Sequence, residues 1–185
     1  MHLRELFLRE DDRSTAVFAF GRFNPPTIGH EKLIQKVQSV ASKMNGKGYI
    51  FLSHTGGTAK DPIDFTTKLS YLRQHFQADK NLSFGDTRAN TIIKVMKVLE
   101  QEGRTKIIMI AGDDRVMQFS NLLNQYNGKP TKAGNIEYTF DSIEVVSAGQ
   151  RDPDADDVTG VSASKARELA MKGQEHEFSK IIMGG

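Results

Sequence analysis

A threonine and a histidine three residues apart are the side chains in this sequence best suited to phosphate chemistry. Thr27 and His30 end the decapeptide Gly21-Arg-Phe-Asn-Pro-Pro-Thr-Ile-Gly-His30. Residues at this spacing share a face at the start of a helix, beside backbone N–H groups that attract anions. Gly29 would let a phosphate approach the backbone closely. The spacing predicts a phosphate-holding turn; the simpler interpretation is a capped helix with a surface histidine.

The residues on either side of the decapeptide predict the elements that would position it. The apolar run Ala16–Phe20 is typical of a buried strand. Apolar residues at helical spacing then predict a helix over Ile28–Lys43. Thr27, which follows two prolines, is the expected N-cap of that helix. The decapeptide is therefore predicted to be a strand-to-helix turn.

The rest of the chain continues to alternate between strand and helix patterns. Further strands are expected at Tyr49–Ser53, Leu82–Phe84, Lys106–Ala111, Tyr138–Phe140 and Ile143–Val146. Further helices are expected at Phe65–Phe76, Thr91–Glu102, Asp114–Tyr126, Ser162–Met171 and His176–Met183. This alternation predicts an α/β fold, a Rossmann-like three-layer sandwich with a parallel sheet. Ligands of such folds bind beyond the carboxyl ends of the strands.

Composition limits the class of protein. A length of 185 residues suits a single domain spanning residues 1–185. The absence of cysteine excludes disulfides and thiol nucleophiles and fits a reducing compartment. No segment has the length of an apolar membrane span, and the charged N-terminus is unlike a signal peptide. With a net charge of only +2, we expect a cytoplasmic protein with neither a membrane nor a nucleic-acid partner.

A second group of candidate anion-binding residues stands near the C-terminus, in Gly160-Val-Ser-Ala-Ser-Lys-Ala-Arg167. Ser162 is the expected N-cap of a helix, which puts Lys165 in its first turn and Arg167 in its second. Cations there oppose the helix dipole by roughly 0.3 to 1 kcal/mol. An anion bound among the N–H groups, the serine hydroxyls and these side chains would remove the conflict. In the simpler interpretation the two cations point into water.

Polar side chains also follow two of the other expected strands. Asp113 and Asp114 come directly after Lys106–Ala111 in Ala111-Gly-Asp-Asp114. Carboxylates in this position can accept hydrogen bonds from a ribose or a base. The competing interpretation is that an aspartate caps the next helix. Lys60 lies in the loop after the second strand, where a solvated lysine is the simpler interpretation.

The decapeptide resembles the signature of the HxGH/TxGH nucleotidyltransferases, a HUP-type α/β family of adenylyltransferases and cytidylyltransferases. Val161, Ser162, Ser164 and Arg167 are similar to the family's second signature, Ile-Ser-x-Thr-x-x-Arg. Members transfer a nucleoside monophosphate from ATP or CTP to a phosphate-bearing acceptor and release pyrophosphate. The Gly-Arg-Phe start is closer to nicotinamide mononucleotide adenylyltransferases, which favours ATP and a role in NAD biosynthesis. Residues 147–157 also look similar to nucleotidyltransferase-like proteins of large tailed phages.

The resemblance implies a role for each candidate residue. Thr27, His30 and the helix N-terminus would hold the charge that develops on the phosphates. The residues expected to grip the triphosphate are Arg22, Lys165 and Arg167. The residues expected to contact the nucleotide are Gly21, Phe23, Asn24, Gly29, Gly112, Asp113, Asp114, Ser162 and Ser164. Lys60 and Arg115 would contact the acceptor or the phosphates, and Mg²⁺ would be held mainly by phosphates and water.

One residue departs from the commoner form of the signature. Thr27 stands where many members carry their first histidine, although other members have threonine there. Two alternatives to adenylyl transfer therefore remain open. One is cytidylyl transfer from CTP, and the other is a nucleotide-binding or assembly protein that has lost the chemistry. The sequence identifies neither the acceptor nor the oligomeric state.

Overall fold

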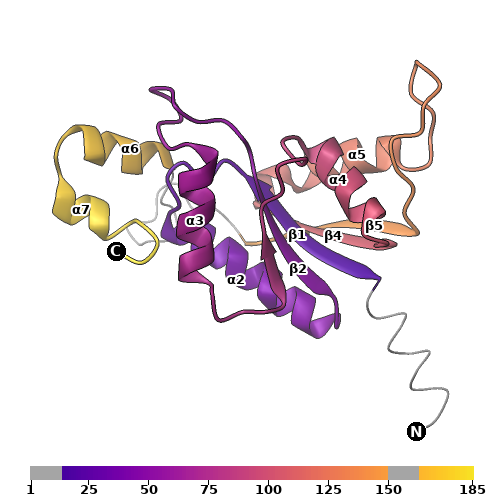
Figure 1. The fold of residues 1–185 in the computed structure, drawn as a ribbon, viewed down its shortest axis with the longest axis horizontal. Coiled ribbons are helices and arrows are strands. Elements are labelled where there is room, and N and C mark those ends of the chain that lie inside the picture. The colour runs from indigo at the N-terminus through magenta and orange to yellow at the C-terminus, as the bar shows by residue number, and fades with distance from the viewer. Residues whose placement is uncertain (1–13, 150–162) are drawn as a thin grey trace, which may run out of the picture.

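The computed structural model describes residues 14–149 and 163–185, whose strands form one parallel sheet (Figure 1). The strands are β1 (Thr15–Gly21), β2 (Lys47–Leu52), β3 (Leu82–Phe84), β4 (Lys106–Ala111) and β5 (Ser142–Ser147). The sheet has five strands in the order β3-β2-β1-β4-β5, and every neighbouring pair is parallel. The predicted α/β fold with a parallel sheet is confirmed.

The helices follow the strands as the sequence predicts. They are α2 (Ile28–Lys43), α3 (Phe65–His75), α4 (Ile92–Gln101), α5 (Asp113–Tyr126), α6 (Ala163–Met171) and α7 (Glu175–Ser179). Thr27 is the N-cap of α2, as expected. Ser162, the expected N-cap of α6, and most of the polar loop before it lie outside the described residues. No helix in the described ranges is both long enough and apolar enough to cross a bilayer.

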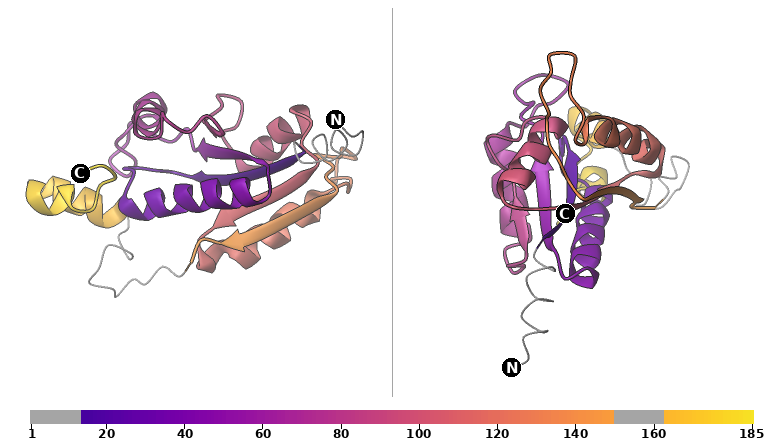
Figure 2. Two further views of the ribbon diagram at one scale, coloured as in Figure 1. Left: turned by 90° about the horizontal axis from the view of Figure 1, so that it is seen from below. Right: turned by 90° about the vertical axis from the view of Figure 1, so that its right-hand side faces the viewer.

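The core forms two layers because successive residues of a strand point to opposite faces of the sheet. Figure 2 shows helices on both sides of the sheet. Ala16 and Phe18 of β1 face α4 and the side chain of Leu123 from α5. Val17 and Ala19 face α2 and the side chain of Leu72 from α3. The sheet is thus covered on both faces, which explains the unbroken apolar runs of β1 and β4.

Two expected elements differ from the structure. Tyr138–Phe140 is not a strand of the sheet: Tyr138 makes one isolated bridge with Asn127, whose side chain bonds both the N–H and the C=O of Phe140. The apolar alternation there reflects burial of the two aromatic rings, at 1% and 5% exposure. The last helix ends at Ser179, because the residues that follow pair with the start of α2.

The strand order creates a reversal between β1 and β4. From β1 the chain runs to β2 and β3 on one side, then crosses to β4 and β5 on the other. The connections after β1 and β4 therefore leave the sheet in opposite directions, which opens a crevice beyond the strand ends. Helices α6 and α7, coloured yellow, also lie beyond these carboxyl ends (Figures 1 and 2).

Candidate functional site

A cavity of about 560 Å³ lies at the carboxyl ends of β1 and β4, at this reversal. It is bounded by the turn from β1 to α2, the turn from β4 to α5, and Ala148 and Gly149 after β5. The predicted site residues that line it are Gly21, Arg22, Thr27, Gly29, His30, Gly112, Asp114 and Arg115. Residues of two turns that are far apart in the sequence thus meet around one space.

The imidazole of His30 is held by Thr27 and Phe23. The backbone N–H of Thr27 donates to Nδ1 of His30 at 3.0 Å, and the Thr27 hydroxyl oxygen lies 2.9 Å from the same nitrogen. The Phe23 ring packs against the imidazole with 4.7 Å between centroids. Because Nδ1 accepts a hydrogen bond, the neutral ring carries its proton on Nε2. Nε2 of His30 therefore lies on the side of the ring away from Thr27.

The C-terminal residues pair with the start of α2, a contact that the sequence analysis missed. The backbone N–H of Ile28 donates to the carbonyl of Ile181 at 3.1 Å, and that of Met183 donates to Pro26 at 3.3 Å. Met183 is fully buried in the core. The first-turn amide of Ile28 is therefore taken by the protein itself. Gly29, the next residue of that turn, borders the cavity.

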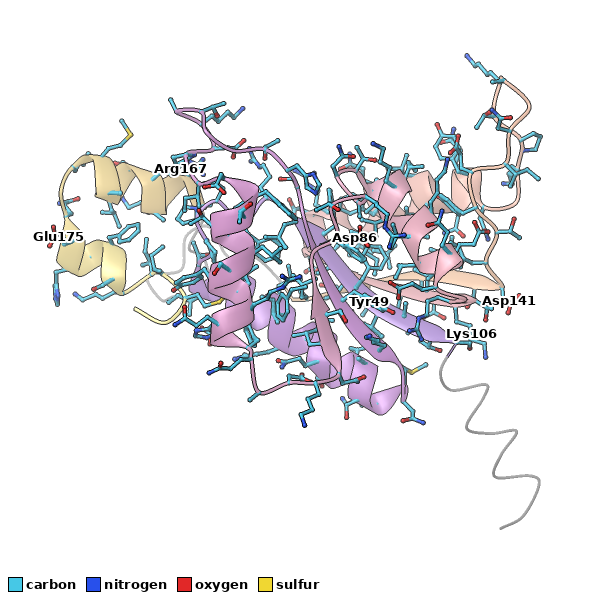
Figure 3. The ribbon with its side chains drawn as sticks, viewed as in Figure 1. Tyr49, Asp86, Lys106, Asp141, Arg167 and Glu175 are labelled. Carbon is cyan, nitrogen blue, oxygen red and sulfur yellow. The ribbon has the colours of Figure 1, made fainter. Side chains whose placement is uncertain are left out.

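The two predicted signatures meet through Arg167. Its Nη1 donates to the backbone carbonyl of Asn24 at 2.5 Å, and its Nη2 donates to the Ser164 hydroxyl at 3.1 Å. Figure 3 shows Arg167 on α6, at the end nearer the rest of the domain. The Lys165 ammonium lies 3.6 Å from the Glu168 carboxylate on the same helix, and both side chains are about half exposed. In the described structure these α6 side chains do not line the cavity, and Arg167 braces the first turn from outside it.

The turn from β4 to α5 is short and exposed. Gly112 is the N-cap of α5 and Asp113 its first residue, so the interpretation of an aspartate as the cap is wrong. The Asp113 carboxylate accepts a hydrogen bond from the Ser147 hydroxyl at the end of β5. Asp114 lines the cavity, 3.7 Å from Nε of Arg115. Asp114 is therefore the aspartate of the pair that borders the cavity.

Two other predicted residues have different surroundings. The Asn24 side chain is 1% exposed and forms two hydrogen bonds with the backbone of Ile63, at 2.8 and 3.0 Å. It therefore ties the loop after β2 to the first turn. Lys60 is exposed in that loop and is not among the residues that line the cavity. Within residues 14–149 and 163–185, no group of three or more His, Asp or Glu side chains could hold a metal ion.

The sequence analysis missed a fully buried lysine behind the first turn. The ammonium of Lys68 in α3 donates to the carbonyls of Arg22, Ser53 and Thr55 at 2.8, 3.0 and 3.0 Å. Burial lowers the pKa of Lys68, and the nearby Asp61 opposes that effect. The available signal was spacing: Lys68 precedes Leu72 by four residues and so shares the buried face of the helix.

Comparison with solved structures shows a similar fold. Plasmodium falciparum nicotinic acid mononucleotide adenylyltransferase complexed with NaAD matches at a TM-score of 0.63 and 13% identity, over 93% of this chain and 92% of that chain. The same enzyme complexed with APC matches at 0.62, with the same identity and coverage. No protein-family model and no curated protein sequence matches the chain. At this identity the likeness concerns the fold.

Proposed function

We propose that this protein is a nucleotidyltransferase that transfers AMP from ATP to a phosphate-bearing acceptor and releases pyrophosphate. The observation that carries the proposal is that His30, Gly29 and Arg22 of the signature turn line the cavity at the strand reversal. Open α/β sheets bind their ligands at such a reversal. The similarity of fold to an adenylyltransferase supports the same reaction class.

In this reaction an oxygen of the acceptor phosphate attacks the α-phosphorus in line. The new bond joins that oxygen to the α-phosphorus, and the bond to the bridging oxygen breaks, so that pyrophosphate leaves. The protein would contribute position and charge stabilisation, with no covalent intermediate. The Nε2–H of His30 and the first turn of α2 would donate to phosphate oxygens. The Arg22 guanidinium, which is half exposed at the cavity wall, would neutralise the triphosphate.

We expect Mg²⁺ to accompany the triphosphate. Mg²⁺ prefers oxygen ligands and keeps several waters and phosphate oxygens in its coordination shell. The Asp114 carboxylate is an oxygen donor at the cavity wall, which fits this requirement. Bound there, the ion would neutralise charge on the phosphates.

The proposed nucleotide and acceptor rest on similarity. The Gly21-Arg-Phe start of the signature favours ATP and nicotinamide mononucleotide, and the similar enzyme is named for a nicotinic acid mononucleotide. A panel of nucleotides in a thermal-shift assay would test the base, because a ligand of the native state raises the melting temperature. A larger shift with ATP than with CTP is expected. The reverse order would favour cytidylyl transfer.

The test of the reaction is pyrophosphate release. Wild-type protein with Mg²⁺, ATP and nicotinamide mononucleotide should release pyrophosphate, and a panel of other phosphorylated acceptors extends the assay. His30→Ala should lower turnover at least about 100-fold while the protein remains folded. His176→Ala is the matched control, since His176 is an exposed histidine on α7. Near-normal turnover by His30→Ala would refute the role of that residue.

A nucleotide-binding protein without the chemistry is the second candidate. The observation that favours it is Thr27, whose hydroxyl lies beside Nδ1 of His30. ATP-dependent thermal stabilisation without pyrophosphate release from any acceptor would favour this candidate over the enzyme.

A further inference from the structure

Lys68 is a buried charge with an unusual set of partners. Its ammonium donates to three backbone carbonyls: that of Arg22, just after β1, and those of Ser53 and Thr55, just after β2. An ammonium has three hydrogens, so these carbonyls use its full donor capacity. A lysine is rarely fully buried unless it is paired in this way. The carboxyl ends of two neighbouring strands are thus fastened to one atom.

The peptide that Lys68 holds leads into a strained residue. Phe23 has a φ of +48°, in the left-handed region that residues with a β-carbon rarely adopt. The Lys68 bond to the Arg22 carbonyl fixes the peptide that immediately precedes Phe23. Because C=O and N–H of a trans peptide point in opposite directions, the same bond sets the direction of the Phe23 N–H. Lys68 therefore helps to hold the backbone at the point where the Arg22 side chain begins.

Asp61 connects Lys68 to the Arg22 side chain. Asp61 is 8% exposed, and its Oδ1 lies 3.7 Å from Nη1 of Arg22 but has no hydrogen-bond partner within the described structure. Its negative charge also acts on Lys68. The carboxylate thus interacts by charge with a buried cation and with a half-exposed one. It restrains Arg22 by charge at the cavity wall.

We propose that Lys68 is a positioning residue which, together with Asp61, places the Arg22 guanidinium to receive the phosphates of a nucleoside triphosphate. Lys68 fixes the Arg22 backbone, and Asp61 restrains its side chain. This inference rests on the proposed function for its ligand. The three hydrogen bonds from Lys68 to the carbonyls after β1 and β2, which we call the clamp, do not depend on any ligand.

ATP binding measured by isothermal titration calorimetry, with Mg²⁺ present, separates positioning from simple charge. Lys68→Met removes the clamp and should raise the Kd for ATP about tenfold. Asp61→Asn keeps the shape of the side chain and should raise it about threefold. If the two residues acted only through charge, Asp61→Asn would tighten binding, because it makes the site more positive. A lowered Kd for Asp61→Asn would therefore overturn the proposal.

A double-mutant cycle tests whether both residues act through Arg22. In an Arg22→Met background, Lys68→Met and Asp61→Asn should have no further effect on the Kd for ATP. Effects that persist in that background would contradict the proposal. Lys94→Met, at an exposed position on α4, is the matched control and should bind ATP as the wild type does. If Lys68→Met fails to fold, the Asp61→Asn cycle decides alone.

Amide hydrogen exchange without nucleotide distinguishes failure of this inference from failure of the proposed function. Lys68→Met should speed exchange in peptides that cover residues 21–24 and 53–56, while those from β4 keep wild-type rates. Unchanged exchange in both segments would overturn the clamp. If the clamp is seen but wild-type protein binds no ATP, the proposed function and the role of Lys68 toward triphosphate both fail, and the clamp remains.

Discussion

The two strand-to-helix turns that border the cavity are built in opposite ways. The turn from β1 to α2 contains several buried side chains and bonds to distant parts of the chain: Asn24 to Ile63, Ile28 to Ile181 and the Arg22 carbonyl to Lys68. The turn from β4 to α5 is Gly112 alone, followed by two exposed aspartates. Both turns reach the same cavity.

Because of this difference, substitutions in the two turns should differ in how much they change folding stability and ligand binding. In the first turn a change of side chain disturbs buried hydrogen bonds that other elements share. In the second turn the Asp114 side chain is exposed and lines the cavity, so a change there affects chiefly what the cavity presents to a ligand. Substitutions in the first turn should therefore change folding stability and binding together, whereas those in the second should change binding alone.

Asn24→Ala should give the largest loss of stability. It removes two buried hydrogen bonds to Ile63 and leaves the partner groups unsatisfied, which costs about 3 kcal/mol. The control is Asn124→Ala on α5, where the amide is exposed and a change below about 0.5 kcal/mol is expected. Urea denaturation measures both, and equal losses would contradict the comparison.

Two buried groups, Lys68 behind the first turn and Tyr138 against α5, should contribute to the pH dependence of the free energy of unfolding with opposite sign. Burial raises the pKa of Tyr138, whose hydroxyl donates to Leu123 of α5, from 10.0 to about 12. The unfolded chain loses that proton first, so the free energy of unfolding falls as pH rises through this range, by at most about 3 kcal/mol. The pKa of Lys68 is lowered, so its contribution to the free energy of unfolding instead rises as pH increases toward 10.5.

The measurement is urea denaturation at several pH values from about 9 to about 11.5. Tyr138→Phe should show a shallower fall in stability with pH than the wild type. The free energy of unfolding of Tyr138→Phe should still fall somewhat with pH, because burial and the hydrogen bond to Glu102 also raise the pKa of Tyr49. Parallel curves for wild type and Tyr138→Phe would refute this assignment.

The glycines at the ends of the two strands form a matched pair. A β-carbon at Gly21 would lie 3.0 Å from the buried Phe23 ring, so Gly21→Ala should cost roughly 1 to 2 kcal/mol. At Gly112 it would meet only the free end of the exposed Asp114 side chain, and φ is −63°. Gly112→Ala should stay within about 0.5 kcal/mol. Thermal denaturation of both variants tests this, and a larger loss at Gly112 would reverse the comparison.

Asp114→Asn should have the smallest effect on stability. The Asp114–Arg115 pair is 3.7 Å apart and largely exposed, and such pairs contribute less than about 1 kcal/mol. We expect the melting temperature to stay within about 2 °C of the wild type. Under the proposed function the affinity for ATP with Mg²⁺ should nevertheless fall. Unchanged affinity for ATP would show that Asp114 does not contribute to nucleotide binding.

Much of the fold could be predicted because local patterns carry it. The apolar runs of β1 and β4 and the helical spacing of α2 place these elements within one residue of their predicted bounds. Thr27 could be predicted as the N-cap of α2 from the two prolines before it. Burial without sheet pairing produces a similar pattern, and for that reason Tyr138–Phe140 was wrongly predicted as a strand.

The sequence by itself identified the residues that we propose bind phosphate, because the first signature is a contiguous turn whose cap, glycine and histidine lie within one helical turn. Only the tertiary structure decided which of them meet. Lys68, Asp61 and Ile181 hold the signature turn from three other segments of the chain, and no local periodicity encodes such contacts. The strand order brought Gly112 and Asp114 to the same cavity, because side chains from distant turns converge only when their strands are neighbours in the sheet.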